Sequence, residues 1–154
     1  MTVAPPEEKP PILQRQLKLV EHFNSLGNWE ARYKEIIAMG KRIPEMPKEL
    51  YQDQFLVKGC QSQVWLKASR SVEGKVILQA DSDALIVKGL VTLLLETFSQ
   101  SSPQEILQSS PEFIKDLGFA HSLSPSRANG FLAMLKQIHL YATAFNLVDK
   151  GSKS

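Results

Sequence analysis

The sequence predicts an α+β fold, in which helices pack on a small antiparallel sheet of about three strands. Two observations support this class. Apolar residues recur at helical spacing over residues 12–40 and again after residue 82. Between these regions, residues 54–81 contain short runs of β-branched and aromatic residues, which strands prefer. Helices that are separated along the chain from a small sheet are typical of an α+β domain.

The chain of 154 residues suits one domain, which we expect over residues 12–148. Residues 1–11 are rich in proline and glutamate and residues 149–154 are polar, so both are predicted to be disordered tails. We expect no signal peptide, and the longest apolar run, Ala84–Leu95, is shorter than the roughly 20 residues that span a bilayer. A formal charge of +2 without a basic stripe argues against nucleic acid. We therefore expect a cytoplasmic protein that binds neither membrane nor nucleic acid.

Two helices are predicted at the start of the domain. In the first, Gly27 marks the end of an apolar stripe: Leu13, Leu17, Val20 and Phe23. Asn28 is a good N-cap for the second helix, which continues to Gly40. The next segment, "RIPEMPKEL", holds two prolines three residues apart and is predicted to be an extended or turning connector, not a helix.

Three short strands are predicted next. "FLVKG" indicates a first strand from about Gln54, and "QVWLKASR" indicates a second. Gly74 gives the turn "VEGK" its backbone freedom, and "KVILQAD" completes a hairpin. Alternation in this last strand puts three apolar residues on one face: Val76, Leu78 and Ala80. Cys60 falls in the connection between the first two strands.

The most apolar segment predicts the central helix of the fold. We place it from Asp83 to about Ser99, with Ser82 as the N-cap and the Asp83 carboxylate in the first turn, where it suits the helix dipole. Because the segment is apolar nearly all round, the helix should be buried. Asp81 and Asp83 could instead form a metal or acid/base pair, but we favour the helix-start interpretation.

The remaining helices are short except the last. "SPQE" (102–105) is a capping box with proline at the first helical position. Ser110 begins a helix that ends at Gly118. Ser124 begins the longest helix, which carries an apolar stripe: Phe131, Leu135, Ile138, Ala142 and Phe145.

Cys60 is the only cysteine of the chain and the first candidate for chemistry. A lone cysteine often serves as a small apolar residue in a core. Here Gly59 permits a sharp turn before the thiol, and Gln61 and Ser62 offer polar side chains and N–H groups that could hold an anionic sulfur. A loop position also lets another molecule reach the thiol. One cysteine excludes an internal disulfide and a multi-cysteine metal site, and we expect no metal.

A nucleophilic cysteine usually works with a histidine base. His121, in a loop before the last helix, is the candidate partner, whereas His22 and His139 lie within helices and are predicted to be surface residues. A Cys60–His121 dyad would make a stand-alone thiol hydrolase or transferase, which is the alternative function. Arg127 lies in the first turn of the last helix, where a cation gains nothing from the dipole. It is therefore paired with a carboxylate or has another purpose.

Four stretches of the chain carry a family resemblance: "NWEARYKEIIAMGKRIPEMP" (28–47), "GCQSQVWL" (59–66), "DSDALIVKGL" (81–90) and "LSPSRANG" (123–130). Together and in this order they resemble the SufE family of sulfur-acceptor proteins, which includes CsdE-like members. The likeness covers roughly residues 12–147. One departure is that many members have a histidine directly before the leucine of the last motif. Here Ser122 takes that place and His121 lies one position earlier.

The resemblance implies a SufE/IscU-like fold and a sulfur carrier. Such proteins take persulfide sulfur from a pyridoxal-phosphate-dependent cysteine desulfurase of the SufS or CsdA type and stimulate that enzyme. They pass the sulfur to an iron–sulfur scaffold such as SufBCD. The chain itself needs no cofactor, because pyridoxal phosphate belongs to the desulfurase.

By the same resemblance, Cys60 is the persulfide acceptor. Five further residues are expected to bind the partner or support the loop: Gly59, Gln61, Ser62, Asp83 and Arg127. A third interpretation is a non-catalytic adaptor in which Cys60 only packs.

Overall fold

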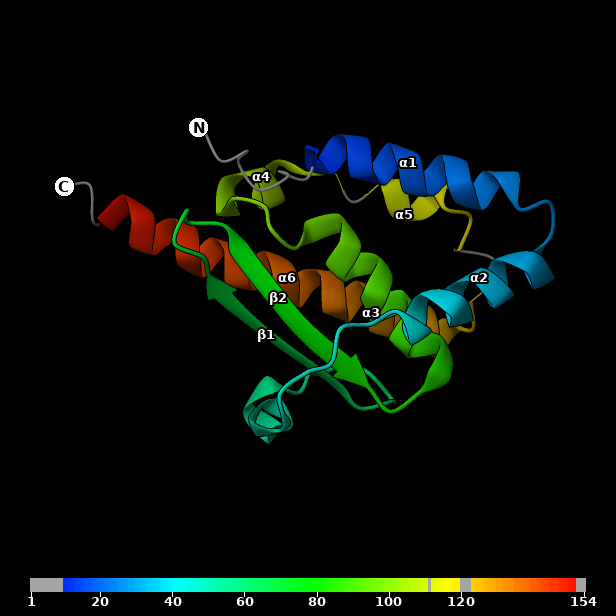
Figure 1. The fold of residues 1–154 in the computed structure, drawn as a ribbon, viewed down its shortest axis with the longest axis horizontal. Helices are drawn as coiled ribbons and strands as arrows, with labels where there is room; N and C mark the ends of the chain where they lie inside the picture. Colours follow the sequence, from blue (N-terminus) through cyan, green and yellow to red (C-terminus); the bar gives the residue numbers. More distant parts are fainter. Residues whose placement is uncertain (1–9, 111, 120–122, 152–154) are drawn as a thin grey trace, which may run out of the picture.

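The computed structural model describes residues 10–110, 112–119 and 123–151. Within this part of the chain, six α-helices and two short 3-10 helices pack with a two-stranded antiparallel sheet (Figure 1). Their order is α1 (Ile12–Ser25), α2 (Trp29–Lys41), η1 (Lys48–Leu50), η2 (Asp53–Phe55), β1 (Val64–Arg70), β2 (Val76–Ser82), α3 (Leu85–Phe98), α4 (Pro103–Gln108), α5 (Phe113–Asp116) and α6 (Pro125–Gly151). The predicted α+β class is confirmed.

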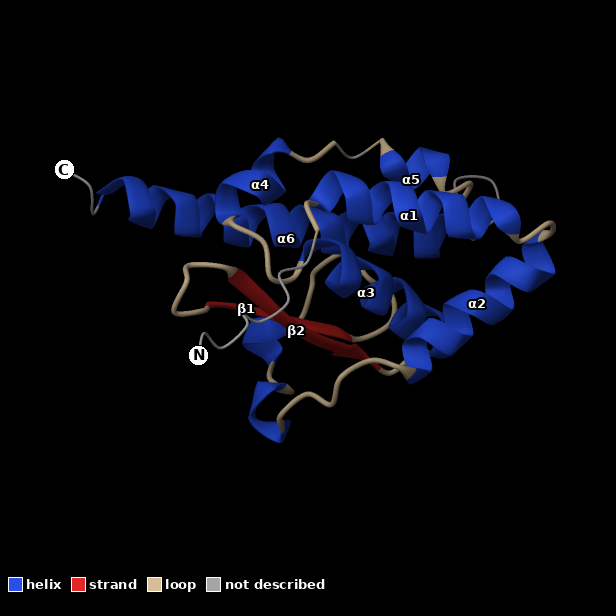
Figure 2. Ribbon diagram, turned by 45° about the horizontal axis from the view of Figure 1, so that its top comes forward, coloured by secondary structure: helices blue, strands red, loops and turns tan. Residues whose placement is uncertain are grey.

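Helix α3 lies at the centre of the fold, as its apolar sequence predicted. Nearly all its side chains are buried, and α1, α2, β2 and α6 all pack against it. In Figure 1, α1 and α5 lie above α3, the β1–β2 hairpin lies below and to its left, and the long α6 runs behind. Figure 2, turned by 45°, shows the same arrangement. Because layers cover α3 on several sides, its stripe of leucine and valine forms the core.

The sheet has two strands, so the prediction of three is wrong. β1 and β2 pair antiparallel from Val64–Ser82 to Arg70–Val76, and the buried face of β2 alternates as predicted. The stretch expected as a first strand makes only one bridge, between Leu56 and Trp65. Beyond it the chain turns away from β1 at Gly59, whose φ is +94°. Pairing therefore stops before residues 58–62, called here the Cys60 loop.

The start of α3 also differs from the prediction. Ser82 is the last residue of β2, Asp83 lies before the helix, and the N-cap residue Ala84 has no side-chain cap. The Ser82 hydroxyl instead donates to the main-chain oxygen of Gln63 at 2.8 Å and accepts from the Ala84 N–H at 3.3 Å. It therefore joins β2 to the residue that follows the Cys60 loop.

Three other predicted helix starts are confirmed, whereas the short helix that we expected to begin at Ser110 begins at Phe113. Asn28 accepts from the N–H three residues on at 2.8 Å, and Ser102 and Ser124 accept equivalent bonds at 3.1 and 3.3 Å. Glu105, however, does not complete its capping box. Its carboxylate accepts from the N–H of Ile12 at 2.7 Å and so joins α4 to the first residue of α1.

The long α6 extends further than expected. Residues 149–151, which we predicted in a polar tail, are helical, and Asp149 pairs with Arg70 at 2.8 Å. Residues 1–9 and 152–154, where the other tail predictions fall, lie outside the described residues. No helix in the described ranges is long and apolar enough to cross a membrane.

The predicted apolar stripe of α1 is only partly buried, and a buried arginine also helps to hold the helix. Phe23 lies in the core and Val20 packs against it, as predicted. Leu13 and Leu17 are 65% and 58% exposed, whereas Arg15 is buried. Its guanidinium donates to the main-chain oxygens of Thr97 and Ser99 at 2.7 and 3.1 Å. These carbonyls lie at the end of α3, where helices leave acceptors unpaired, so Arg15 satisfies them and ties α1 to α3.

Helices α2 and α3 approach most closely at two glycines. A Cβ on Gly89 would lie 2.0 Å from the main-chain oxygen of Ile36, and a Cβ on Gly40 would lie 2.9 Å from the Gly89 nitrogen. No side chain fits between the two backbones at this crossing, so glycine permits the close approach. The contact fixes α2 against the central helix.

Replacing Gly89 by alanine tests this contact. Gly89→Ala should lower the free energy of unfolding by about 2–4 kcal/mol, because the methyl group forces α2 away from α3. Urea unfolding followed by far-UV circular dichroism measures the change. The control is Gly27→Ala, where an added Cβ has no neighbour within 4 Å and the expected change is within about 0.5 kcal/mol. Equal stability of the two variants would contradict the role given to Gly89.

Candidate functional site

The thiol of Cys60 is half-buried and lies against the first turns of α6. Its Sγ is 3.6 Å from the main-chain oxygen of Gly130. A Cβ on Gly130 would lie 3.5 Å from this sulfur, so glycine leaves little spare space there. Gly59 turns the chain sharply before the thiol, as predicted, and sits against Ala133 of α6. The Cys60 loop is thus folded onto α6.

A cavity of about 320 Å³ opens beside the thiol. Three elements enclose it: the Cys60 loop, α3 and the start of α6. Its apolar wall consists of Val87, Leu90 and Met134. Its other lining residues are mostly polar: Gln61, Ser62, Ser124, Ser126, Arg127 and Gly130. The structure therefore brings four of the predicted site residues, Cys60, Gln61, Ser62 and Arg127, to one cavity.

Burial raises the pKa of Cys60 above its ordinary value, because a partly apolar cavity disfavours the thiolate. The thiolate is the nucleophilic form of cysteine, so the raised pKa lowers the fraction of reactive sulfur at neutral pH. In this conformation Cys60 is a sheltered, mainly protonated thiol.

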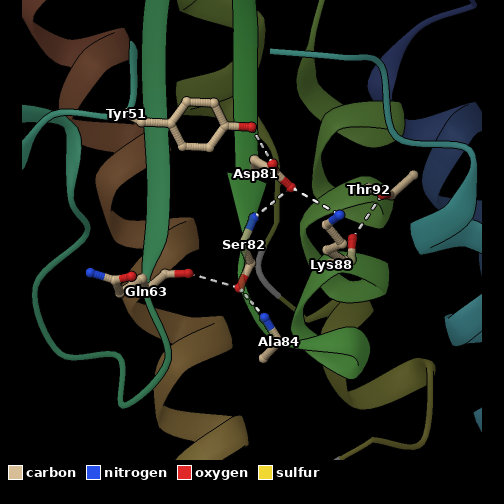
Figure 3. Close-up of polar contacts among 7 residues, drawn as sticks. All are labelled: Tyr51, Gln63, Asp81, Ser82, Ala84, Lys88 and Thr92. Atoms are coloured by element: carbon tan, nitrogen blue, oxygen red, sulfur yellow. Dashed lines mark hydrogen bonds and ion pairs between the residues drawn. The ribbon is translucent and has the colours of Figure 1, made fainter. Parts of the chain in front are cut away.

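The side chains of Ser82, the last residue of β2, and of Asp83, the next residue, hold Gln63, which follows the Cys60 loop. The Asp83 carboxylate accepts from the Gln63 N–H at 3.1 Å, and the Gln63 oxygen accepts from the Ser82 hydroxyl at 2.8 Å. Figure 3 shows Ser82 between Gln63 and Ala84. At the other end of the loop, the Val57 N–H donates to the Val64 oxygen at 2.8 Å. Both ends of the loop are fixed, while the thiol makes one weak hydrogen bond among the described residues and packs against the core.

Arg127 and Asp83, expected on one docking surface, have different surroundings. Arg127 lines the cavity, and its Nη1 donates to the Tyr33 hydroxyl of α2 at 2.8 Å. Within the described residues it forms no ion pair with a carboxylate. Asp83 is not among the cavity-lining residues and is bound by the main chain of Gln63. Arg127 is therefore a cation held beside the thiol by a neutral partner.

The histidine predictions have mixed outcomes. His121 lies outside the described residues, so the Cys60–His121 dyad stays a prediction. His22 is exposed, as expected, and lies 3.6 Å from Glu35. His139 is half-buried, with its ring edge-on to Phe98, so its prediction as a surface residue is wrong.

The sequence did not single out Gly130, Met134 or Tyr33 as site residues. Gly130 lies in the "LSPSRANG" motif, and a glycine within the first two turns of a helix was a usable signal of close approach. Met134 follows one helical turn later on the same side of α6, so helical spacing from Gly130 also pointed to it. Tyr33 lies 94 residues from Arg127, and only the tertiary fold brings the two together.

The fold and the site define a class of α+β proteins that present a lone thiol on a loop at the mouth of a cavity. Residues 17–142 match the family model of SufE, described as an Fe-S metabolism associated domain. This match covers most of the chain, so the protein belongs to the SufE family and has a role in iron–sulfur metabolism.

The fold is similar to the solution structure of a hypothetical protein from Thermus thermophilus. The TM-score is 0.73 at 24% sequence identity, over 90% of this chain and 99% of that chain. At this level of identity the likeness shows the fold alone.

The pH dependence of Cys60 alkylation tests its sheltered state. Because burial raises the pKa of Cys60, the rate with iodoacetamide should reach half its plateau at a higher pH in the folded protein than in urea. The unfolded chain releases this proton first as pH rises, so the thiol also makes the folded state less stable above its ordinary pKa. A folded-state midpoint equal to or below the urea value would contradict the assignment.

Proposed function

We propose that this protein accepts sulfur on Cys60 from the persulfide of a pyridoxal-phosphate-dependent cysteine desulfurase of the SufS or CsdA type. It stimulates the desulfurase by removing the sulfur, and it passes the sulfur to an iron–sulfur scaffold of the SufBCD type. The observation that carries the proposal is the placement of the only thiol on a loop at the mouth of a cavity, in a chain of the SufE family.

The chemistry is a transfer of one sulfur atom between two cysteines. The thiolate of Cys60 attacks the outer sulfur of the donor persulfide, and a new S–S bond forms. The donor S–S bond breaks, and the inner sulfur leaves as a cysteine thiolate. The proton of the Cys60 thiol is lost to solvent or to the leaving thiolate. No net oxidation occurs, so no redox cofactor is needed for this step.

The lone cysteine suits a carrier. A second thiol within reach could attack the Cys60 persulfide, release its sulfur as hydrosulfide and form an internal disulfide. The chain holds one cysteine, so this side reaction has no intramolecular partner. The sheltering of the thiol supports the same role, because persulfides and thiolates react readily with solvent oxidants.

Arg127 supports the proposal as a cation for the bound persulfide or the docked partner. It lines the cavity without a carboxylate partner among the described residues, so its charge is available to an anion that enters beside Cys60. Gln61 and Ser62 offer hydrogen bonds in the same cavity, and Gly59 allows the loop to turn. Asp83 acts on the loop through Gln63 instead of facing the cavity.

The serine variant of Cys60 is the direct test. Cys60→Ser should abolish sulfur acceptance, because no other thiol exists, and should keep the far-UV circular dichroism spectrum. The protein is incubated with a desulfurase and cysteine and then weighed intact. The wild type should gain about 32 Da per sulfur, in an adduct that dithiothreitol removes. A serine variant that still gains reducible sulfur would refute the proposal.

Arg127→Ala tests the role of the cavity cation. Desulfurase stimulation at low salt should fall at least about threefold, since a charge near a docking surface speeds association. The matched control is Lys136→Ala, which removes an exposed cation further along α6 and should change little. Tyr33→Phe removes the hydroxyl partner but keeps the charge, so its loss should be smaller than that of Arg127→Ala. Unchanged stimulation in Arg127→Ala at low and moderate salt would mean that the residue is structural.

A further inference from the structure

Three elements meet at the carboxylate of Asp81, near the end of β2. It accepts a hydrogen bond from the Tyr51 hydroxyl and one from the Ser82 N–H at 2.8 Å. The ammonium group of Lys88 in α3 lies 3.6 Å away. Figure 3 shows these groups converging on one side chain. We call Tyr51, Asp81 and Lys88 the Asp81 cluster.

Tyr51 fixes a segment whose other described contacts with the sheet are apolar or involve an aromatic ring. Residues 48–55 contain η1 and η2, and η2 buries none of its side chains. In this segment Leu50 is buried, and the Tyr51 ring lies edge-on to Trp65 of β1 with centroids 4.9 Å apart. Lys67 of β1 also lies 5.8 Å from the centre of the Phe55 ring. Among the described residues, the bond from the Tyr51 hydroxyl to Asp81 is the side-chain hydrogen bond that joins this segment to the sheet.

The segment leads into the Cys60 loop through Leu56 and Val57, which pair with β1. Tyr51 therefore ties the chain before the loop to Asp81, while Gln63, after the loop, is tied to Ser82. Asp81 and Ser82 are neighbours in β2, and the Asp81 carboxylate accepts from the Ser82 N–H. These side-chain contacts on either side of the loop thus meet at two adjacent residues of β2, while Leu56 and Val57 pair with Trp65 and Val64 of β1.

We propose that the Asp81 cluster consists of positioning residues that set how readily the Cys60 loop opens toward a sulfur donor. The loop opens around ends that β1 and β2 hold, and loosening the Tyr51–Asp81 bond shifts it toward the open, accessible state. The proposal rests on the proposed function for the identity of the donor, but not for the opening itself.

Lys88 extends the cluster to the cavity wall. It belongs to the first turn and a half of α3, between Val87 and Leu90, which line the cavity beside the thiol. The ion pair with Asp81 therefore holds the cavity wall and the 48–55 segment to the same carboxylate. A change at Asp81 reaches the thiol from both sides.

The hydrogen bond persists over the physiological pH range. The bond to Asp81, with smaller contributions from burial and from the charges of Asp81 and Glu45, raises the pKa of Tyr51 to about 12. The phenol is therefore a proton donor at neutral pH. Because this pKa is raised, the stabilisation from Tyr51 is complete below the ordinary tyrosine pKa and is lost as pH rises toward the folded-state value.

The test uses Tyr51→Phe in the full chain, without desulfurase. Removing the hydroxyl should raise the iodoacetamide rate of Cys60 at neutral pH at least about threefold, because the rate follows the open fraction. The midpoint of the alkylation pH profile should move down, since a more exposed thiol loses part of the burial that raises its pKa. The matched control is Tyr141→Phe, which removes a tyrosine hydroxyl bonded at 3.0 Å to Leu66 of the same sheet and should leave both readouts unchanged.

Variants of Asp81 provide the conservative comparison. Asp81→Asn keeps one oxygen, which can still accept from Ser82, and its amide nitrogen can donate to the Tyr51 hydroxyl in place of the bond that the carboxylate accepted. It loses the charge that pairs with Lys88. Its alkylation rate should lie between that of the wild type and that of Asp81→Ala. The same rate in Asp81→Asn and Asp81→Ala would assign the effect to the Lys88 ion pair alone and would contradict the role of Tyr51.

A second readout uses the desulfurase. If loop opening limits docking, the concentration of Tyr51→Phe that gives half-maximal stimulation should fall while the maximum stays the same. Failure of all sulfur transfer would refute the proposed function and leave the alkylation result standing. The inference is overturned if Cys60 in Tyr51→Phe is alkylated at the wild-type rate. It is also overturned if the increase in alkylation rate is no larger than the variant's measured loss of unfolding free energy explains through global unfolding.

Discussion

The close approach of α2 and α3 at Gly89 is the constraint on which the site depends. With the Ile36 oxygen directly against Gly89, α2 has one position on the central helix. That position carries Tyr33 to the start of α6, where it holds Arg127. The same contact fixes the first turns of α3, which form the apolar wall beside Cys60. The close approach of α2 and α3, which glycine permits, therefore sets the positions of the Arg127 cation and of the apolar cavity wall relative to the thiol.

The thiol itself reflects two opposed requirements. A sulfur carrier must shelter its cysteine from solvent reagents and still present it to a partner. Burial in the cavity meets the first requirement and raises the pKa of Cys60. The second is met by the weakness of the polar contacts at the tip of the loop, where the hydrogen bond of the thiol in the described structure is the one to the Gly130 oxygen at 3.6 Å. Strong attachments are placed at the ends of the loop, so the tip can move without unfolding its surroundings.

Local signals in the sequence predicted most of the fold, and long-range contacts explain the errors. The caps at Asn28, Ser102 and Ser124 were predictable because each side chain bonds to a nitrogen three residues away. Ser82 has the same chemistry, but its hydroxyl donates to Gln63, 19 residues earlier. On α1, the pattern favoured the leucines because nothing local indicates that Arg15 would find acceptors more than 80 residues away.

The same distinction applies to the candidate site. The motif around Cys60 marked the thiol and its neighbours Gly59, Gln61 and Ser62, because a turn and polar groups adjoin it in the sequence. The cavity was not predictable, because its walls come from α3 and α6, and Gly130 lies 70 residues from Cys60. Asp83 and Arg127, two charges near helix starts, suggested one docking surface. In the fold, Asp83 binds Gln63 beside the loop, and Arg127 lines the cavity.

The missing third strand and the polar contacts at the end of β2 are two aspects of one arrangement. A full strand before Cys60 would have been held to β1 by a ladder of main-chain bonds, which would fix the loop close to the thiol. Here the pairing is reduced to the Leu56–Trp65 bridge, so the preceding segment depends on side chains. Tyr51 and Asp81 supply such a contact. One side-chain hydrogen bond can break by itself, whereas the main-chain hydrogen bonds of a strand pair break together. The chain before the thiol can therefore loosen without disrupting the β1–β2 pair.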